Sequence, residues 1–262
     1  MTYYLWICTP EDYPFSQCFF DQAYPLQEAL TELGHNCQIV INEPPHTQEN
    51  VIIFGGHLIK HEIPKNWIIY NLEQVTEGSP WMVESYLTLL KKNPVWDYIE
   101  DNVTKLGVEA KILPVGYMPC MTRLKKQEPT WDIFHYGCLN QRREYVLNVL
   151  ISKGIKVNVA FNIFGQERDD FISKSRAVIN MGFYESKIFN ITRCGYLFAN
   201  RVPVISEIGR GSEPFHETGG FANYSDIIDK CFEVLENPEP VGEKGFDIFS
   251  KMSQKDYLCS II

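Results

Sequence analysis

The sequence lacks the surplus of basic residues that proteins binding polyanions usually carry. Its 24 Lys and Arg are outnumbered by 33 Asp and Glu, which gives a formal net charge of −9 at pH 7. Proteins bind nucleic acid largely by neutralising phosphates with many cationic side chains. We therefore do not expect nonspecific binding to DNA, RNA or anionic membranes, and nucleic acid is not an expected partner.

Long hydrophobic runs are also missing. The longest clean apolar stretches, such as residues 51–56 and 67–70, are far shorter than the ~20 residues that cross a bilayer. The N-terminal stretch has no basic region and reaches Glu11 and Asp12 too early for a signal peptide. These absences predict a soluble, cytoplasmic protein without a transmembrane segment.

Cysteine is present, but not in metal-binding or redox patterns. None of the eight cysteines forms a C-x-x-C pair, and no histidine lies at ligand spacing from one: Cys8, Cys18, Cys37, Cys120, Cys138, Cys194, Cys231 and Cys259. Structural zinc and a dithiol redox centre are therefore not expected, and no metal site is predicted. A chain of 262 residues can bury a core without cross-links, so most of these thiols should be buried and reduced.

Short apolar runs alternate with helix-length amphipathic segments, which is typical of an α/β protein with parallel sheets. The predicted strands are 3–8, 37–41, 51–54, 67–71, 95–99, 111–113, 131–136, 156–160, 177–180 and 202–206. The predicted helices are 19–33, 79–90, 141–150, 167–174, 186–199, 225–236 and 246–258. A polar segment at 119–129 reads as a linker. We predict two Rossmann-like, doubly wound domains, residues 1–122 and 123–262, that face a ligand-binding cleft.

One candidate anion site lies at residues 134–144. A predicted strand runs through Gly137 into a predicted helix whose first turn carries Arg142 and Arg143. Free backbone N–H groups at a helix N-terminus attract anions, so this layout suits a diphosphate. It lacks the G-x-G-x-x-G fingerprint and the P-loop lysine pattern, which argues against an ordinary dinucleotide fold and a P-loop NTPase. The alternative is that both arginines are solvated charges on an ordinary helix.

A second candidate site lies at residues 180–193. A predicted strand is followed by Glu185 and by a predicted helix, capped at Ser186, that carries Lys187, Asn190 and Arg193. A carboxylate can bind sugar hydroxyls while the nearby cations hold phosphate. The alternative is that Glu185 and Ser186 are routine capping residues, which leaves the basic residues unexplained.

Polar residues also follow two predicted strands of the first half. Glu73 comes just after strand 67–71 and is a candidate base or sugar-binding group. His57 follows a Gly-Gly turn after strand 51–54 and is a candidate general base or sugar contact. A lone histidine is more often structural, and that alternative stays open for His57.

These motifs resemble the nucleotide-sugar-binding domain of GT-B glycosyltransferases, particularly the small bacterial and viral members of the group 1 type. The matching stretches are residues 136–143, 164–168, 177–185 and 193–207, with further likeness at 70–74 and 95–98. The resemblance covers most of the chain. It implies a GT-B architecture with an acceptor-side domain first and a donor-binding domain second.

The resemblance also implies roles for individual residues. The family's diphosphate-holding turn falls on Gly137, Leu139 and Arg143, and the first glutamate of its Glu-x7-Glu signature, which contacts the donor sugar, falls on Glu185. The second glutamate of that signature, which binds ribose, is replaced by Arg193, so Glu207 becomes the alternative carboxylate. The candidate catalytic residues are Glu73, His57 and Glu185. The candidate donor-binding residues are Gly137, Leu139, Asn140, Arg142, Arg143, Phe164, Lys187, Asn190, Arg193 and Glu207.

The activity implied by the resemblance is transfer of a sugar from a nucleotide sugar, such as a UDP- or GDP-sugar, to a glycan, a lipid-linked acceptor or a small molecule. No metal or further cofactor is implied, because basic side chains stabilise the leaving diphosphate. Glu73 or His57 would serve as the acceptor-side base if the enzyme inverts the anomeric centre. A retaining enzyme needs no such base, and the sequence leaves both outcomes open.

Three other functions stay open. A glycosyltransferase that modifies DNA bases, as some phage enzymes do, has the basic strip at 123–126 in its favour and the charge of −9 against it. A non-catalytic nucleotide-sugar-binding module is supported by Arg193 at the ribose position. A periplasmic two-lobed sugar-binding protein is disfavoured by the absent signal peptide and the unpaired cysteines.

Overall fold

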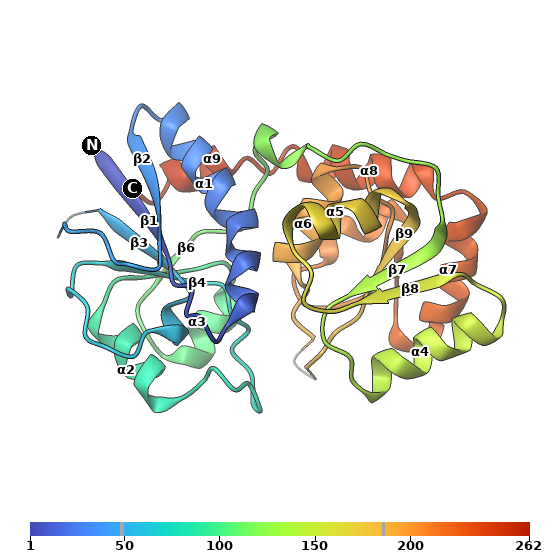
Figure 1. Ribbon diagram of the computed structural model, residues 1–262, viewed down its shortest axis with the longest axis horizontal. Coiled ribbons are helices and arrows are strands. Elements are labelled where there is room, and N and C mark those ends of the chain that lie inside the picture. Colours follow the sequence, from blue (N-terminus) through green and yellow to red (C-terminus); the bar gives the residue numbers. More distant parts are fainter. Residues whose placement is uncertain (48–49, 185–186) are drawn as a thin grey trace. The chain divides into compact units, whose positions relative to one another are not determined.

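The computed structural model describes residues 1–47, 50–184 and 187–262 and divides the chain into two compact α/β units. Unit 1 comprises Met1–Cys120 and Ser253–Ile262, and unit 2 comprises Met121–Met252. The C-terminal helix α9 (Gln254–Cys259) returns to unit 1 and packs beside α1 (Phe20–Glu32) (Figure 1). The predicted boundary between residues 122 and 123 places this helix in the second domain, because no local sequence pattern indicates that the chain returns to the first.

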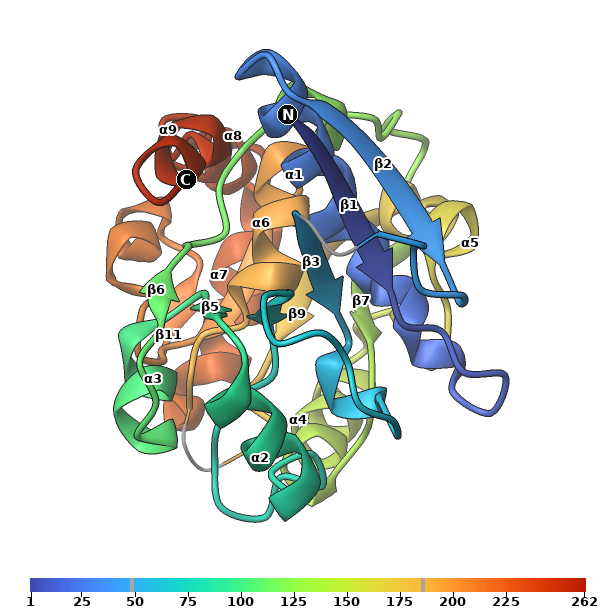
Figure 2. The same ribbon diagram turned by 90° about the vertical axis from the view of Figure 1, so that its left-hand side faces the viewer.

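Unit 1 is built on a six-stranded parallel sheet in the order β2-β1-β3-β4-β5-β6. Figure 2 shows β2, β1 and β3 side by side with their arrows pointing the same way. The strands are β1 (Thr2–Ile7), β2 (Asn36–Ile41), β3 (Val51–Phe54), β4 (Ile68–Asn71), β5 (Val95–Asp97) and β6 (Lys111–Ile112). β3 is buried at all four positions, as expected for a strand covered on both faces. The helices are α1, α2 (Glu84–Lys92), α3 (Glu100–Leu106) and α9.

Unit 2 is built on a five-stranded parallel sheet in the order β11-β10-β9-β7-β8. Its strands are β7 (Trp131–Tyr136), β8 (Val157–Ala160), β9 (Ser175–Asn180), β10 (Val204–Glu207) and β11 (Phe221–Ala222). Its helices are α4 (Gln141–Ser152), α5 (Gly165–Ser173), α6 (Ile191–Ala199), α7 (Ile227–Glu236) and α8 (Glu239–Phe249). In each sheet all paired strands are parallel, so their carboxyl ends share one edge, where ligands bind in folds of this kind. Both sheets confirm the predicted α/β class.

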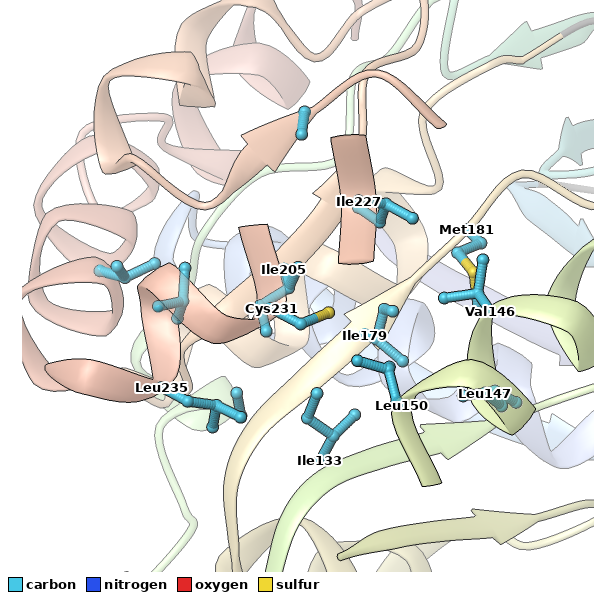
Figure 3. Packing of buried hydrophobic residues seen from close by; sticks show 14 residues of the cluster. Ile133, Val146, Leu147, Leu150, Ile179, Met181, Ile205, Ile227, Cys231 and Leu235 are labelled. Carbon is cyan, nitrogen blue, oxygen red and sulfur yellow. The ribbon is translucent and has the colours of Figure 1, made fainter. Parts of the chain in front are cut away.

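Side chains alternate between the two faces of the unit 2 sheet. Ile133 on β7 joins a core with Leu150 of α4 and Cys231 of α7, as Figure 3 shows. The next residue, Phe134, points to the other face and stacks on Phe171 of α5 at a centroid distance of 5.6 Å. Period-two alternation of apolar residues therefore holds helices on both faces of the sheet.

Three predicted helices differ from the structure. The helix predicted at 186–199 begins only at Ile191, because Ile188 forms a parallel bridge with Arg210 and Asn190 then caps the helix. The helix predicted from 79 begins at Glu84, since the preceding Val83 is extended. The helix predicted at 246–258 is two helices, α8 and α9.

Within the described ranges, no helix combines the length and the hydropathy needed to cross a membrane.

Candidate functional site

The turn at Gly137 joins β7 to α4 at the carboxyl edge of the unit 2 sheet. Gly137 has φ of 117°, in the region that favours glycine. A Cβ at this position would lie 2.6 Å from Nη2 of Arg193. Asn140 caps α4, since its Oδ1 accepts a hydrogen bond from the Arg143 backbone N–H at 3.0 Å. Glycine thus allows the Arg193 guanidinium to lie against the turn that leads into the N-terminus of α4.

Replacing Gly137 by Ala should therefore displace Arg193 and weaken the binding of a nucleoside diphosphate. We expect at least a tenfold loss of UDP affinity in calorimetry, with a stability cost of about 1–3 kcal/mol from the strained backbone. The matched control is Gly154→Ala, because Gly154 has φ of 90° but open space around the position of a Cβ. Equal losses of UDP affinity in both variants would contradict a role for the close approach of Arg193.

Arg142 is held by a buried carboxylate from β10. Its Nη2 donates to Glu207 Oε1 at 2.7 Å, and its Nη1 donates to the Gly182 carbonyl at 3.1 Å. The other carboxylate oxygen of Glu207 accepts the Gly182 backbone N–H at 3.0 Å. The Tyr224 ring packs under the guanidinium at 4.1 Å, a contact that no local sequence pattern indicates. Glu207 is only 5% exposed and both its oxygens are engaged, so it fixes Arg142 and the loop after β9.

Arg143 is also buried, at 4% exposure, and is committed to backbone carbonyls. Its guanidinium donates to the carbonyls of Cys138 and Met181 and packs over the Phe183 ring. Burial and the neighbouring Arg193 lower the pKa of Arg143 to about 9. The helix that starts at 141 is confirmed, and its first arginines tie the Gly137 turn to the loop after β9 rather than lying as solvated charges.

Arg193 lies in the first turn of α6 and is less constrained. Its guanidinium packs over the Tyr136 ring at 4.8 Å, and its Nη1 is 3.5 Å from Asn180 Oδ1. Beneath it, His135 is fully buried, and burial together with Arg193 lowers the pKa of His135 to about 3. His135 is therefore neutral, and the positive charge at this edge comes from the arginines.

The remaining candidates of unit 2 surround the same edge. Asn190 caps α6, its Oδ1 accepting the Arg193 backbone N–H at 3.1 Å. Lys187 is half exposed with Nζ 3.5 Å from Glu207 Oε1. Leu139 is 42% exposed in the Gly137 turn, and Phe164 is the residue before α5, after β8. Glu185 and the predicted cap Ser186 lie outside the described residues.

In unit 1, His57 and Glu73 meet at the carboxyl edge of β3 and β4. Their Nε2 and Oε1 atoms are 3.8 Å apart. The His57 side chain is 2% exposed and its pKa is lowered to about 4 by burial, whereas burial raises the pKa of Glu73 to about 7. A neutral imidazole thus faces a carboxyl group that exchanges its proton near neutral pH, which suits general base or acid catalysis.

A buried polar network fixes the backbone that carries Glu73. Asn71 donates to Asp97 Oδ2 at 2.7 Å, and Asn102 donates to Asp97 Oδ1 at 3.0 Å. Asn71 Oδ1 accepts the Glu73 backbone N–H at 3.2 Å. Sequence reasoning missed this network, although Asn71 and Asp97 end neighbouring parallel strands and are direct partners in register.

Within the described parts of both units, no three His, Cys, Asp or Glu side chains are grouped as ligands for a metal ion.

Comparison with known proteins gives relatives and a fold. No protein-family model matches the sequence. "Uncharacterized protein L140" of Acanthamoeba polyphaga mimivirus is 28% identical over 214 residues, which cover 75% of this chain and 67% of that protein. "Uncharacterized protein R358" of the same virus is 27% identical over 248 residues, which cover 90% and 83%.

Among solved structures, AviGT4, a glycosyltransferase involved in avilamycin A biosynthesis, superposes with a TM-score of 0.61 over 99% of this chain and 96% of its own, at 12% identity. The chain has the GT-B glycosyltransferase fold. The same GT-B likeness extends to TarM, with a TM-score of 0.55, 14% identity, and coverage of 80% of this chain and 53% of that one. An α-glucosyltransferase in complex with UDP and a 13-mer DNA gives 0.54 at 10% identity over 99% of both chains. At these identities the GT-B likeness concerns the fold alone.

Proposed function

We propose that the protein is a cytoplasmic glycosyltransferase that moves a sugar from a nucleotide-sugar donor, bound by unit 2, to an acceptor hydroxyl. The observation that carries this proposal is the placement of Arg193 against the Gly137 turn, where the N-terminus of α4 begins, in a chain with a GT-B fold. A helix N-terminus and a neighbouring guanidinium whose charge is not neutralised by an ion pair together form a site for a diphosphate. All eight cysteines are free, but only Cys8, Cys194 and Cys231 are buried, so the prediction that most of the thiols are buried is wrong.

On the donor side, the reaction breaks the bond between the anomeric carbon and the diphosphate, and negative charge develops on the leaving oxygen. Fixed cationic donors lower the barrier by stabilising that charge. We assign this task to Arg193, Lys187 and the N-terminus of α4. Arg142, paired with Glu207, and Arg143, bound to backbone carbonyls, hold the two loops in place, and Arg143 adds to the local positive potential. Glu185 keeps its proposed contact with the donor sugar.

For Glu207 we propose a different role from the ribose contact that the family resemblance suggests. Its carboxylate is already engaged by Arg142 and by the Gly182 backbone N–H. A ribose hydroxyl would have to compete with a charge-assisted hydrogen bond of 2.7 Å in a buried place. We therefore propose that Glu207 positions Arg142 and the loop after β9.

On the acceptor side, we propose Glu73 as the base of an inverting reaction. The pKa of Glu73, raised to about 7, leaves its carboxylate available above neutral pH and makes it more basic than an ordinary glutamate. His57 stays neutral in this range because its own pKa is lowered. A lowered pKa also makes the imidazole a weaker base than the Glu73 carboxylate, so His57 is the weaker candidate for the base.

Transfer should not depend on a metal ion. Guanidinium groups and a helix N-terminus can take the place of a divalent cation at the leaving diphosphate. We expect turnover to be unchanged, within about twofold, after dialysis against EDTA. A loss of turnover that added Mg²⁺ or Mn²⁺ restores would contradict this proposal.

A thermal-shift screen against UDP, GDP, CDP and ADP sugars, followed by a turnover assay with the stabilising donors, tests the proposed function. Stabilisation followed by release of the nucleoside diphosphate supports a transferase. Stabilisation without release, even with a pool of cell-extract acceptors, supports a non-catalytic nucleotide-sugar-binding module, in which Arg193 at the ribose position would serve binding alone.

A further inference from the structure

The two units differ in charge. Unit 1 contains seven Lys, no Arg and sixteen Asp and Glu, so it carries the whole net charge of −9. Unit 2 contains seventeen basic and seventeen acidic residues, including all eight arginines. Unit 1 therefore repels polyanions, whereas unit 2 carries all the guanidinium groups, including those proposed to hold the diphosphate.

The carboxyl edge of the unit 1 sheet carries a cluster of aromatic rings. Trp81 lies in the loop after β4, with its ring centroid 4.6 Å from that of His57 and 5.4 Å from that of Tyr13. Tyr13 comes from the segment that follows β1. Both Trp81 and Tyr13 are partly exposed. Partly exposed Trp and Tyr offer an apolar face with a polar tip, which suits a ligand that is itself part apolar and part polar.

The His57 imidazole supplies the second feature of this edge. The His57 side chain is only 2% exposed, and its Nε2 makes no hydrogen bond to any described residue. A buried polar atom usually has a hydrogen-bond partner. The Glu73 carboxylate is 3.8 Å away, which is too far for a direct hydrogen bond. An oxygen atom about 2.8 Å from both Nε2 and Oε1 fits that separation and would satisfy both groups.

We propose that this edge of unit 1 binds an uncharged sugar ring, with its apolar face on Trp81 and Tyr13 and one hydroxyl oxygen between His57 Nε2 and Glu73 Oε1. This inference rests on the proposed function, because that hydroxyl is then the acceptor. In the transfer step its oxygen forms the bond to the anomeric carbon, its proton passes to Glu73, and the electron pair of the broken bond leaves with the diphosphate. His57 donates a hydrogen bond to the attacking oxygen and holds it in place.

The charge of unit 1 selects against acceptors that carry phosphate groups. A nucleobase in DNA or RNA could also stack on Trp81, but its phosphates would approach a unit of net charge −9 that has no arginine. A lipid-linked acceptor with a diphosphate beside its sugar meets the same repulsion. A neutral glycan or glycoside offers hydroxyl groups but no negative charge, so unit 1 does not repel it.

Saturation-transfer NMR with the full chain tests this inference. The probes are the methyl α- and β-glycosides of glucose, galactose, mannose and N-acetylglucosamine, together with a 20-mer single-stranded and duplex DNA. We expect saturation transfer to at least one methyl glycoside and none to either DNA. Trp81→Ala should weaken that binding at least tenfold, and Tyr24→Ala, which removes a ring 43% exposed on α1, should leave it unchanged.

A second variant keeps the test decisive if Trp81→Ala does not fold. His57→Gln should weaken binding of the same glycoside three- to tenfold while the far-UV circular dichroism and the urea unfolding midpoint stay close to those of the parent. Binding of no glycoside in the panel, binding of DNA instead, or full affinity in the His57 variant would each overturn the inference. Binding of UDP is measured on the same samples, so UDP binding without glycoside binding refutes this acceptor site and leaves the proposed function standing.

Discussion

Replacing Glu73 by Gln should lower the transfer rate by about 10²–10⁴-fold, the usual contribution of a general base, and should at the same time stabilise the protein above pH 7. The two effects share one cause. Burial raises the pKa of Glu73 from 4.5 to about 7, so the ionised form that catalysis needs is the form that the folded state disfavours. Glutamine keeps the size of the side chain and removes the charge.

The pH dependence of stability follows from the same pKa. Between pH 4.5 and 7 the unfolded chain releases the Glu73 proton while the folded chain retains it, so the free energy of unfolding falls as pH rises. The full difference corresponds to about 3 kcal/mol. Glu73→Gln should therefore be more stable than the parent at pH 8 and nearly equal to it at pH 4.5.

Urea unfolding at both pH values and turnover of a sugar nucleotide measure these effects. The parent enzyme should show kcat/KM rising tenfold per pH unit up to about pH 7 and then levelling off. The control is Glu77→Gln, because Glu77 is exposed in the same loop. A Glu73 variant that retains its rate, or one that is less stable than the parent at pH 8, contradicts the assignment of the base.

Replacing Arg193 by Ala should weaken UDP binding by about 10²-fold, or about 2.7 kcal/mol. Arg193 makes only a 3.5 Å hydrogen bond to Asn180 and a ring contact with Tyr136, so its charge is not consumed by an ion pair among the described residues. Arg142, by contrast, is already paired with Glu207. Arg193→Lys should recover only part of the affinity, since an ammonium group lacks the planar fork of donors.

Calorimetric titration with UDP compares these variants with Arg201→Ala, in which a surface arginine paired with Glu243 is removed. NMR titration of His135 gives a readout independent of the nucleotide. Its pKa, lowered by burial and by Arg193, should move toward the ordinary value in Arg193→Ala. Equal UDP affinity in the Arg193 and Arg201 variants would remove Arg193 from the donor site.

Much of the fold could be read from the sequence, because buried parallel strands are short apolar runs and amphipathic helices repeat every three to four residues. The strand at 51–54 and the start of the helix at 141 are found where they were predicted. The start of α6 could not be predicted, because it depends on a bridge between Ile188 and Arg210. The return of α9 to unit 1 likewise depends on contacts far apart in the chain.

Part of the candidate site could also be predicted from the sequence, for the same reason. Residues that follow strands of a parallel sheet gather at one edge, so the proximity of His57 and Glu73 follows from topology. The ion pair between Arg142 and Glu207 does not follow from topology, since it depends on a loop geometry that only the folded structure shows. The raised pKa of Glu73 is also a property of burial and is absent from any local pattern.

The most direct test of sugar transfer by this protein is release of a nucleoside diphosphate from a panel of sugar nucleotides, measured for the parent, Glu73→Gln and Arg193→Ala. If unit 2 binds the donor and Glu73 is the base, the parent releases the diphosphate from at least one donor in the presence of a glycoside acceptor. Glu73→Gln then binds UDP normally but releases almost none, and Arg193→Ala loses both binding and release. Normal nucleotide binding by the parent with no release from any donor, at any pH from 6 to 9, would contradict a transferase.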